Sequence, residues 1–191
     1  MRGPLIILSG PSGSGKSTVL ARLLAQTDLP LHLSVSATTR KPRPGEIDGF
    51  HYYFWSRERF LRERDAGAFL EWAEVHEEYY GTLKSEVEPN RSQGKGVILD
   101  IDVQGATQVR RLYADSVSVF LRTSSLGAYE ERLRRRATED EAAIQRRLAA
   151  ARRELEHAAG YDYQVINDDL DAAVAQLRAI VQGLMQRENH A

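Results

Sequence analysis

Short runs of apolar residues alternate along the chain with longer stretches in which apolar residues recur every three or four positions. The first run, "LIILS" at residues 5–9, stops at a glycine and predicts a buried strand. Residues 16–26 follow with a helical stripe of apolar positions. The same patterns predict further strands at residues 31–36, 52–54, 69–75, 96–100, 117–121 and 164–166. They predict helices at residues 57–66, 84–93, 103–112, 126–136 and 139–157, and a last helix that carries Leu170, Val174, Leu177, Val181 and Leu184.

The alternation of strands with helices predicts an α/β fold, in which a parallel sheet is flanked by helices on both faces. Residues 37–83 interrupt this alternation with short strands of mixed polarity, as an inserted lobe would. Within that segment, residues 37–51 hold two prolines and two glycines and are expected to form a loop.

Composition narrows the classes of protein that remain. The 191 residues are enough for one sizeable domain with a core of its own. A net charge of −1 and a pI near 6.5 lack the positive surplus of a general nucleic-acid binder, so no nucleic-acid partner is expected. The absence of cysteine excludes disulfide bonds and thiolate metal sites and makes the cytoplasm the expected location. No apolar run reaches the roughly 18 residues of a membrane span, so no membrane partner is expected.

Residues 10–17, "GPSGSGKS", match the phosphate-loop pattern G-x-x-x-x-G-K-[ST] between a predicted strand and a predicted helix. The glycines let main-chain N–H groups turn toward phosphate oxygens, and the helix beginning near Lys16 adds its positive end. Lys16 is expected to reach the β and γ phosphates, and Ser17 to offer a hydroxyl to Mg²⁺. The alternative is a Gly/Ser-rich turn before an ordinary helix.

A second acidic motif, "VILDID" at residues 97–102, places Asp100 and Asp102 at the end of a predicted buried strand. The carboxyl ends of strands form the edge at which open α/β sheets bind ligands. Both carboxylates are therefore candidates to hold Mg²⁺, directly or through water. The alternative is a strand end with solvated carboxylates.

The basic stretch "TTRKPRPGE", residues 38–46, gathers positive charge between prolines. Arg40 and Arg43 offer planar guanidinium groups suited to a second phosphate, and Pro42 and Pro44 stiffen the loop that carries them. From charge alone, a solvated loop is the alternative. The chain lacks N-K-x-D, which weighs against a GTPase, and a nucleotide-driven switch leaves a second anion site without a purpose.

Four stretches, "SVSATTRKPRPGEIDG", "FLEWAEVHEEYYGT", "VILDIDVQG" and "INDDL", together with the phosphate loop, resemble the guanylate kinases in order and spacing. The resemblance runs from about Leu5 to the last helix. It implies one domain, about residues 4–184, that transfers the γ-phosphoryl group of ATP to GMP with Mg²⁺. It divides the chain into a P-loop core (1–36, 84–125 and 158–191), a GMP-binding lobe (37–83) and a lid with its flanking helices (126–157).

The resemblance also implies residue roles. ATP phosphates and adenine would contact Gly10, Pro11, Ser12, Gly13, Ser14, Gly15, Lys16, Ser17, Thr18 and Asn167. GMP would contact Ser36, Arg40, Arg43, Tyr52, Glu71, Tyr80, Thr82 and Asp100. The catalytic cations would be Lys16, Arg43, Arg136 and Arg147. The other arginines between residues 132 and 153 are interleaved with glutamates, and most are expected to lie on solvated helix faces.

Chemistry supports Glu71 as the guanine reader, because one carboxylate can accept from both N1–H and the exocyclic amine of guanine, whereas adenine N1 is an acceptor. The alternative for Glu71 is a solvent-facing carboxylate on a strand of period two. Two departures from the family pattern leave the proposed ligands in place: Ala137 follows Arg136 where the family often has glycine, and "HEE" at residues 76–78 lacks a glycine common there.

Two alternatives to a guanylate kinase stay open on sequence grounds. One is a non-catalytic binding module of the same fold, although such modules typically lose the phosphate loop that this chain retains. The other is a kinase of the same shape that acts on a different phosphorylated acceptor. Whether the chain is a monomer or a homo-oligomer, and whether it accepts dGMP, is left open by the sequence.

Overall fold

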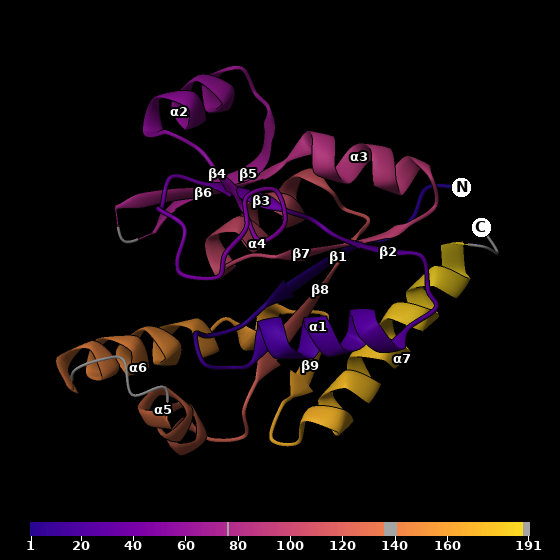
Figure 1. Ribbon diagram of the computed structural model, residues 1–191. Helices are drawn as coiled ribbons and strands as arrows, with labels where there is room; N and C mark the ends of the chain where they lie inside the picture. Colours follow the sequence, from indigo (N-terminus) through magenta and orange to yellow (C-terminus); the bar gives the residue numbers. More distant parts are fainter. Residues whose placement is uncertain (76, 136–140, 189–191) are drawn as a thin grey trace.

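The computed structural model describes residues 1–75, 77–135 and 141–188 (Figure 1). Its centre is a five-stranded parallel sheet in the order β2-β7-β1-β8-β9. These strands are β1 (Leu5–Ser9), β2 (Leu31–Leu33), β7 (Gly96–Asp100), β8 (Ser116–Arg122) and β9 (Tyr163–Ile166). The fold class expected from the alternation of strands and helices is confirmed.

Helices cover both faces of this sheet because each central strand is apolar on both sides. In β1, Ile6 and Leu8 pack with α1 (Lys16–Gln26) and α7 (Leu170–Glu188). Leu5 and Ile7 point the other way and pack with α3 (Lys84–Ser92) and α4 (Val103–Leu112). None of the described helices is long and apolar enough to cross a membrane.

A second, four-stranded sheet lies beside the first and has the order β4-β3-β6-β5. Its strands are β3 (Ser36–Thr38), β4 (Tyr53–Phe54), β5 (Phe69–Val75) and β6 (Glu78–Leu83). Helix α2 (Arg57–Asp65) covers it through Phe60, whose ring stacks on Phe69 at 4.4 Å and on Tyr79 at 5.4 Å between centroids. This small aromatic core packs the second sheet against α2.

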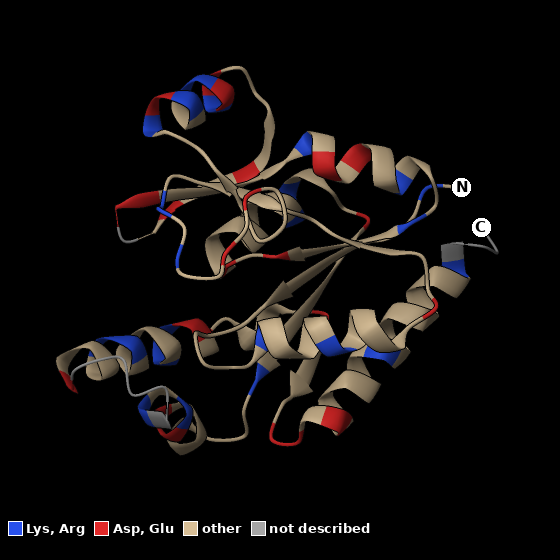
Figure 2. Ribbon diagram, viewed as in Figure 1, with Lys and Arg blue, Asp and Glu red and all other residues tan. Residues whose placement is uncertain are grey.

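A third unit consists of α5 (Leu126–Arg135) and α6 (Glu141–Leu155), followed by the 3₁₀ turn η1 (Ala158–Gly160). The two helices pack through Tyr129, Leu133, Ile144 and Leu148. In Figure 1 this pair and the second sheet with α2 project on the same side of the core sheet, one below and one above. Figure 2 shows Lys and Arg on both projections, including the loop that follows β3.

Two details differ from the expected elements. Residues 31–36 were expected to form one strand, but β2 ends at Leu33 in the core sheet and β3 begins at Ser36 in the second sheet. Strand β3 runs to Thr38, so the loop expected over residues 37–51 begins two residues later. Strand β6 was not expected, because its mixture of tyrosines, glycine and threonine has no clear apolar alternation. It is held by pairing to β3 on one side and β5 on the other, which local patterning does not reveal.

Candidate active site

The loop between β1 and α1 has the conformation that phosphate binding requires. Gly10 has φ 152°, and a Cβ there would lie 2.0 Å from the carbonyl oxygen of Leu121. Gly15 precedes α1 with φ 91°, and a Cβ there would lie 2.4 Å from the Asn167 side-chain nitrogen. Only glycine fits these positions, so main-chain N–H groups at the helix start are available to an anion.

Lys16 and Asp100 meet at the carboxyl edge of the core sheet because β1 and β7 are parallel neighbours, with Leu8 opposite Asp100. The Lys16 ammonium donates to the Gly10 carbonyl at 2.6 Å and lies 4.0 Å from Asp100 Oδ1. Burial raises the pKa of Asp100, and the charge of Lys16 opposes that rise. The lysine is thus held over the phosphate loop beside a carboxylate.

The three predicted metal ligands differ in their exposure and in the hydrogen bonds that they already form. Asp102 caps α4, because its Oδ1 accepts from the Gly105 N–H at 2.8 Å, and its Oδ2 accepts from Gln104 at 3.3 Å. Ser17 is exposed in the first turn of α1, and Asp100 is half-buried nearby. The described part of the chain holds no group of three or more histidine or acidic side chains arranged to bind a metal. Ser17 and Asp100 are therefore better placed than Asp102 to assist a magnesium ion that phosphates already hold.

Asn167, which was expected near adenine, lies against the phosphate loop. Its buried side-chain amide donates to the Ser14 carbonyl at 2.7 Å. Arg132, which no sequence signal distinguished from its neighbours, also binds here and donates to the carbonyls of Asn167 at 2.5 Å and Ser14 at 3.3 Å. A cavity of about 330 Å³ opens at this point and is lined by Gly13, Gly15, Thr18, Arg132, Asn167, Asp168 and Leu170.

The two expected lid arginines have different outcomes. Arg147 on α6 donates through Nη2 to the hydroxyl of Ser12, so the structure brings this arginine to the phosphate loop. Arg136 lies outside the described residues, as does Ala137. The other residues of the phosphate loop form the turn between β1 and α1, in which the Ser14 N–H donates to the Pro11 carbonyl at 2.9 Å.

A second cluster lies in one row across three strands of the second sheet. Thr82 on β6 is opposite Ser36 on β3 and opposite Glu71 on β5. Glu71 Oε1 accepts from the Thr82 N–H at 2.9 Å and from its hydroxyl at 2.6 Å. The structure therefore assembles all three predicted guanine-reading side chains.

Glu71 is buried, with 5% of its surface exposed, because β5 is irregular. The pairing with β6 shifts between Phe69 and Glu71, which is a β-bulge. Leu70 packs with the core-sheet cluster, and the Glu71 carboxylate also faces α4 beside Gly105. The sequence alternative of a solvent-facing carboxylate on a regular period-two strand is therefore wrong.

Burial raises the pKa of Glu71 to about 7, although hydrogen bonds from Thr82 oppose the rise and the charge of Asp102 adds to it. One carboxylate oxygen is occupied by Thr82, while the other faces Gly105, where a Cβ would lie 2.5 Å from Oε2. The side chain is held near its titration point, and a ligand that donates two hydrogen bonds would favour its ionised form.

The phosphate-facing residues of the second sheet form an adjoining group. Tyr80 precedes Thr82 by two residues and so shares its face of β6. Its ring contacts Tyr52 at 6.1 Å between centroids, and the Arg40 guanidinium lies 5.5 Å from the Tyr52 ring. Arg43 is exposed in the same loop. Burial raises the pKa of Tyr52 and the charge of Asp100 adds to the effect, so Asp100 acts on this group as well as on Lys16.

The two clusters come together near Asp100, which lies 4.0 Å from Lys16 and whose charge acts on Tyr52. On one side stand the phosphate loop and Lys16, and on the other Arg40, Arg43 and the tyrosines. Such an arrangement can bring two phosphate-bearing molecules together. Transfer of a phosphoryl group needs mainly positioning and charge neutralisation, which both clusters supply.

The raised pKa of Glu71 predicts a pH-dependent stability. The folded protein binds the Glu71 proton more tightly than the unfolded chain does. The resulting contribution to the free energy of unfolding is therefore complete below the ordinary pKa of 4.5 and is lost as the pH rises through about 7. We expect Glu71→Gln to gain stability relative to wild type between pH 5 and pH 8, by at most about 3 kcal/mol. Urea unfolding at several pH values measures this, with the exposed Glu74→Gln as the control. Parallel pH profiles for Glu71→Gln and wild type would contradict the assignment.

Comparison with known proteins identifies the family. The guanylate kinase family model matches residues 2–184. A guanylate kinase from Methylobacillus flagellatus is 50% identical over 95% of this chain and 89% of its own, and one from Symbiobacterium thermophilum is 51% identical over 94% and 85%. The crystal structure of guanylate kinase from Anaplasma phagocytophilum is 33% identical, with a TM-score of 0.80 over 95% of this chain and 86% of that one. The chain belongs to the guanylate kinase family.

Proposed function

We propose the residue roles by which this member of the guanylate kinase family transfers the γ-phosphoryl group of ATP to GMP. The observation that carries the proposal is the row of half-buried Ser36 and buried Thr82 and Glu71 beside the Arg40 and tyrosine group. A base-reading end and a phosphate-reading end thus lie next to each other on one sheet, facing the phosphate loop.

At the base-reading end, Glu71 accepts from N1–H and the exocyclic amine of guanine in its ionised form. Thr82 already donates twice to Oε1, which holds the carboxylate in place, and Ser36 opposite supplies a further hydroxyl. Adenine would present an acceptor to this carboxylate and leave a buried charge without a partner. Guanine binding is therefore expected to favour loss of the Glu71 proton.

At the phosphate-reading end, Arg40 and Arg43 hold the acceptor phosphate, with Tyr52 and Tyr80 as hydroxyl donors. Asp100 stands between this phosphate and the phosphate loop, because its charge acts on Tyr52 and it lies 4.0 Å from Lys16. Its position suits a group that orders the space between donor and acceptor. No side chain needs to act as a strong base, since the attacking oxygen belongs to an ionised phosphate.

At the donor end, residues 10–18 hold the phosphates of ATP, and Lys16 moves from the Gly10 carbonyl to the β and γ oxygens. The base occupies the cavity beside Asn167 and Arg132. A magnesium ion would be held by Ser17 and by Asp100, directly or through water, and would neutralise charge on the β and γ phosphates. Asp102 would take part only through water, because it caps α4.

We infer that α5 and α6, within residues 126–157, act as the lid and residues 37–83 as the GMP-binding lobe. The contact of Arg147 with Ser12 supports a role in which its charge acts on the transferred group. Arg136 is proposed as its partner. Closure of both units over the phosphate loop would exclude water from the reaction. We propose the cytoplasm as the location of this reaction.

The two alternative functions gain no support. A non-catalytic module does not need Lys16 held over a glycine loop or an arginine beside Ser12. A kinase for another phosphorylated acceptor leaves the buried Glu71–Thr82 pair without a role. An assay of ATP and Mg²⁺ with GMP, dGMP, AMP, UMP and CMP, followed by ADP release, tests the whole proposal. Turnover confined to the guanine nucleotides is the expected result, and preference for another base would overturn it.

Lys16→Met tests the donor site. The change removes the charge that Lys16 places at the β and γ phosphates, so we expect kcat to fall by about 100-fold or more. The melting temperature should stay near that of wild type, because Lys16 makes one hydrogen bond to a loop carbonyl and lies only at the 4.0 Å limit of an ion pair with Asp100. Lys84→Met, which removes a lysine bonded to the Gly67 carbonyl, is the control and should keep full turnover. Wild-type turnover by folded Lys16→Met would refute the role of this lysine.

Glu71→Gln tests the base-reading site. The amide keeps the size of the side chain but turns one acceptor into a donor that faces the donors of guanine. We expect kcat/KM for GMP to fall by about 100-fold or more, while the KM for ATP changes little. Steady-state kinetics with each substrate varied measures both values, with Glu74→Gln as the control. Equal weakening toward ATP and GMP would count against a guanine reader.

Gly105→Ala tests whether the Glu71 carboxylate must lie against α4. The added Cβ would meet Oε2 at 2.5 Å and push the carboxylate from its place, so we expect weaker GMP binding. Gly183→Ala is a matched change in α7, where nothing lies within 4 Å of the added carbon. Both changes raise helix propensity by about 1 kcal/mol. Titration calorimetry with GMP should separate the two variants, and equal affinities would show that Gly105 has no such part.

A further inference from the structure

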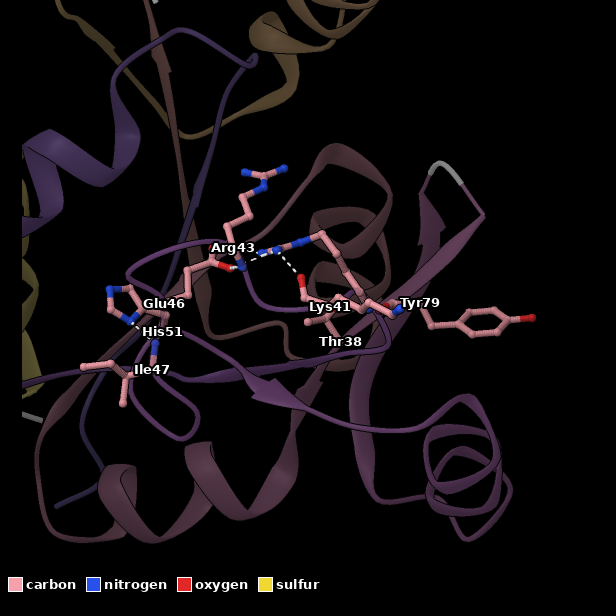
Figure 3. A network of polar contacts seen from close by, with 8 residues as sticks. Thr38, Lys41, Arg43, Glu46, Ile47, His51 and Tyr79 are labelled. Carbon is pink, nitrogen blue, oxygen red and sulfur yellow. Dashed lines mark hydrogen bonds and ion pairs between the residues drawn. The ribbon is translucent and has the colours of Figure 1, made fainter. Parts of the chain in front are cut away.

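Glu46 accepts hydrogen bonds from both arginines of the basic loop, and Figure 3 shows it beside Arg43. Its Oε1 accepts from Arg40 Nη2 at 2.9 Å, and its Oε2 accepts from Arg40 Nη1 at 2.8 Å. Oε2 also accepts from the main-chain N–H of Arg43 at 2.7 Å. Figure 3 shows the Arg43 side chain extending away from the carboxylate while its main chain approaches it. One carboxylate therefore fixes a side chain at one end of the loop and the backbone at the other.

This ion pair is unlike an ordinary surface pair. The side chains of Arg40 and Glu46 are 15% and 17% exposed, and the contact is bidentate. Arg40 lowers the pKa of Glu46 to about 2, with a smaller contribution from the Arg43 N–H, so the carboxylate is ionised at every pH at which the protein works. Exposed single-bond pairs contribute little because their side chains stay mobile, whereas fork-to-fork geometry holds both groups in one plane.

Other contacts complete the immobilisation of Arg40. Nη1 donates a second time, to the Lys41 carbonyl at 2.7 Å, and the guanidinium carbon lies 5.5 Å from the Tyr52 ring and 5.7 Å from the Phe54 ring. A guanidinium carries five N–H donors. Glu46 and Lys41 take both hydrogens of Nη1 and one of Nη2. The Nε–H and the second Nη2 hydrogen lie on the adjacent edge of the guanidinium, which also interacts with the Tyr80 side chain.

We propose that Glu46 is the positioning residue for the acceptor phosphate: it holds the Nη1–Nη2 edge of Arg40 and the peptide of Arg43, so that Arg40 presents its Nε–Nη2 edge to that phosphate. This proposal rests on the proposed function, in which Arg40 and Arg43 bind the phosphate of GMP. Glu46 itself touches no substrate and acts through the two arginines.

The direction in which GMP affinity changes when Glu46 loses its charge distinguishes a positioning role from simple electrostatic repulsion. A carboxylate beside a phosphate site repels the phosphate, so removing its charge should strengthen GMP binding if charge alone mattered. Removing the charge of Glu46 should also strengthen GMP binding if Glu46 only competes with the phosphate for Arg40. A positioning carboxylate gives the opposite sign, because its loss frees the guanidinium to adopt orientations that do not match the phosphate.

Glu46→Gln and Glu46→Asp test the proposal with two ligands, GMP and guanosine, which lacks the phosphate. We expect Glu46→Gln to weaken GMP binding by about tenfold or more and to leave guanosine binding within about twofold. In steady-state kinetics the KM for GMP should rise and the KM for ATP should not. Glu46→Asp keeps the charge but shortens the side chain, so an intermediate loss for GMP is expected. Glu58→Gln on the exposed face of α2 is the matched control and should match wild type.

Arg40→Gln distinguishes failure of this proposal from failure of the proposed function. If Arg40→Gln leaves the ratio of GMP to guanosine affinity unchanged, then Arg40 is no phosphate ligand and the assigned role is wrong. If Arg40→Gln lowers that ratio while Glu46→Gln leaves it unchanged or raises it, the role of Arg40 stands and the role of Glu46 is refuted. If Glu46→Gln and Glu46→Asp weaken the binding of GMP and guanosine equally, then Glu46 only stabilises the loop and the proposal is wrong. The double variant should lose less GMP affinity than the product of the two single losses, because both changes affect Arg40, and any loss beyond that of Arg40→Gln alone reports the contact of Glu46 with the Arg43 N–H.

Discussion

Strand β1 is hydrogen-bonded in parallel to β7 on one side and to β8 on the other, and the positions of the reacting groups follow from this pairing. Parallel neighbours end at the same edge of a sheet, so the glycine loop after β1 and Asp100 at the end of β7 are brought together. A Cβ at Gly10 would strike the carbonyl oxygen of Leu121 in β8, so the loop is shaped against its neighbour strand. The apolar faces of β1, packed between two helical layers, keep this edge in place.

The acceptor side of the site depends on a different constraint, the burial of acidic groups. Glu71 is buried by a bulge in β5, and its ionised form is supported by Thr82 across the sheet but opposed by the nearby charge of Asp102. A carboxylate held in this balance gains most from a ligand that brings two donors. Selectivity for a base is then a consequence of the energy needed to leave a buried charge unpaired.

The arginines of this protein differ in the contacts that hold their side chains. Arg40 is held by Glu46 and two aromatic rings, Arg132 by the carbonyls of Ser14 and Asn167, and Arg147 by Ser12. By contrast, Arg134 on the same helix as Arg132 forms exposed pairs with Glu130 and Glu141. Charge that is fixed in direction can be aimed at a phosphate, whereas an exposed pair is shared with water.

The sequence by itself determined the phosphate loop, the strand and helix that flank it, and the α/β class, because these depend on local spacing and on alternation of apolar residues. It also indicated Glu71, Ser36 and Thr82, but only through resemblance to a family. Tertiary structure decided that β2 and β3 belong to different sheets, that β6 is a strand, that a bulge turns Glu71 inward, and that Arg132 reaches the phosphate loop. Each of these outcomes depends on partners far along the chain, and a local pattern of polarity contains no information about which distant strand will pair or which carbonyl a guanidinium will meet.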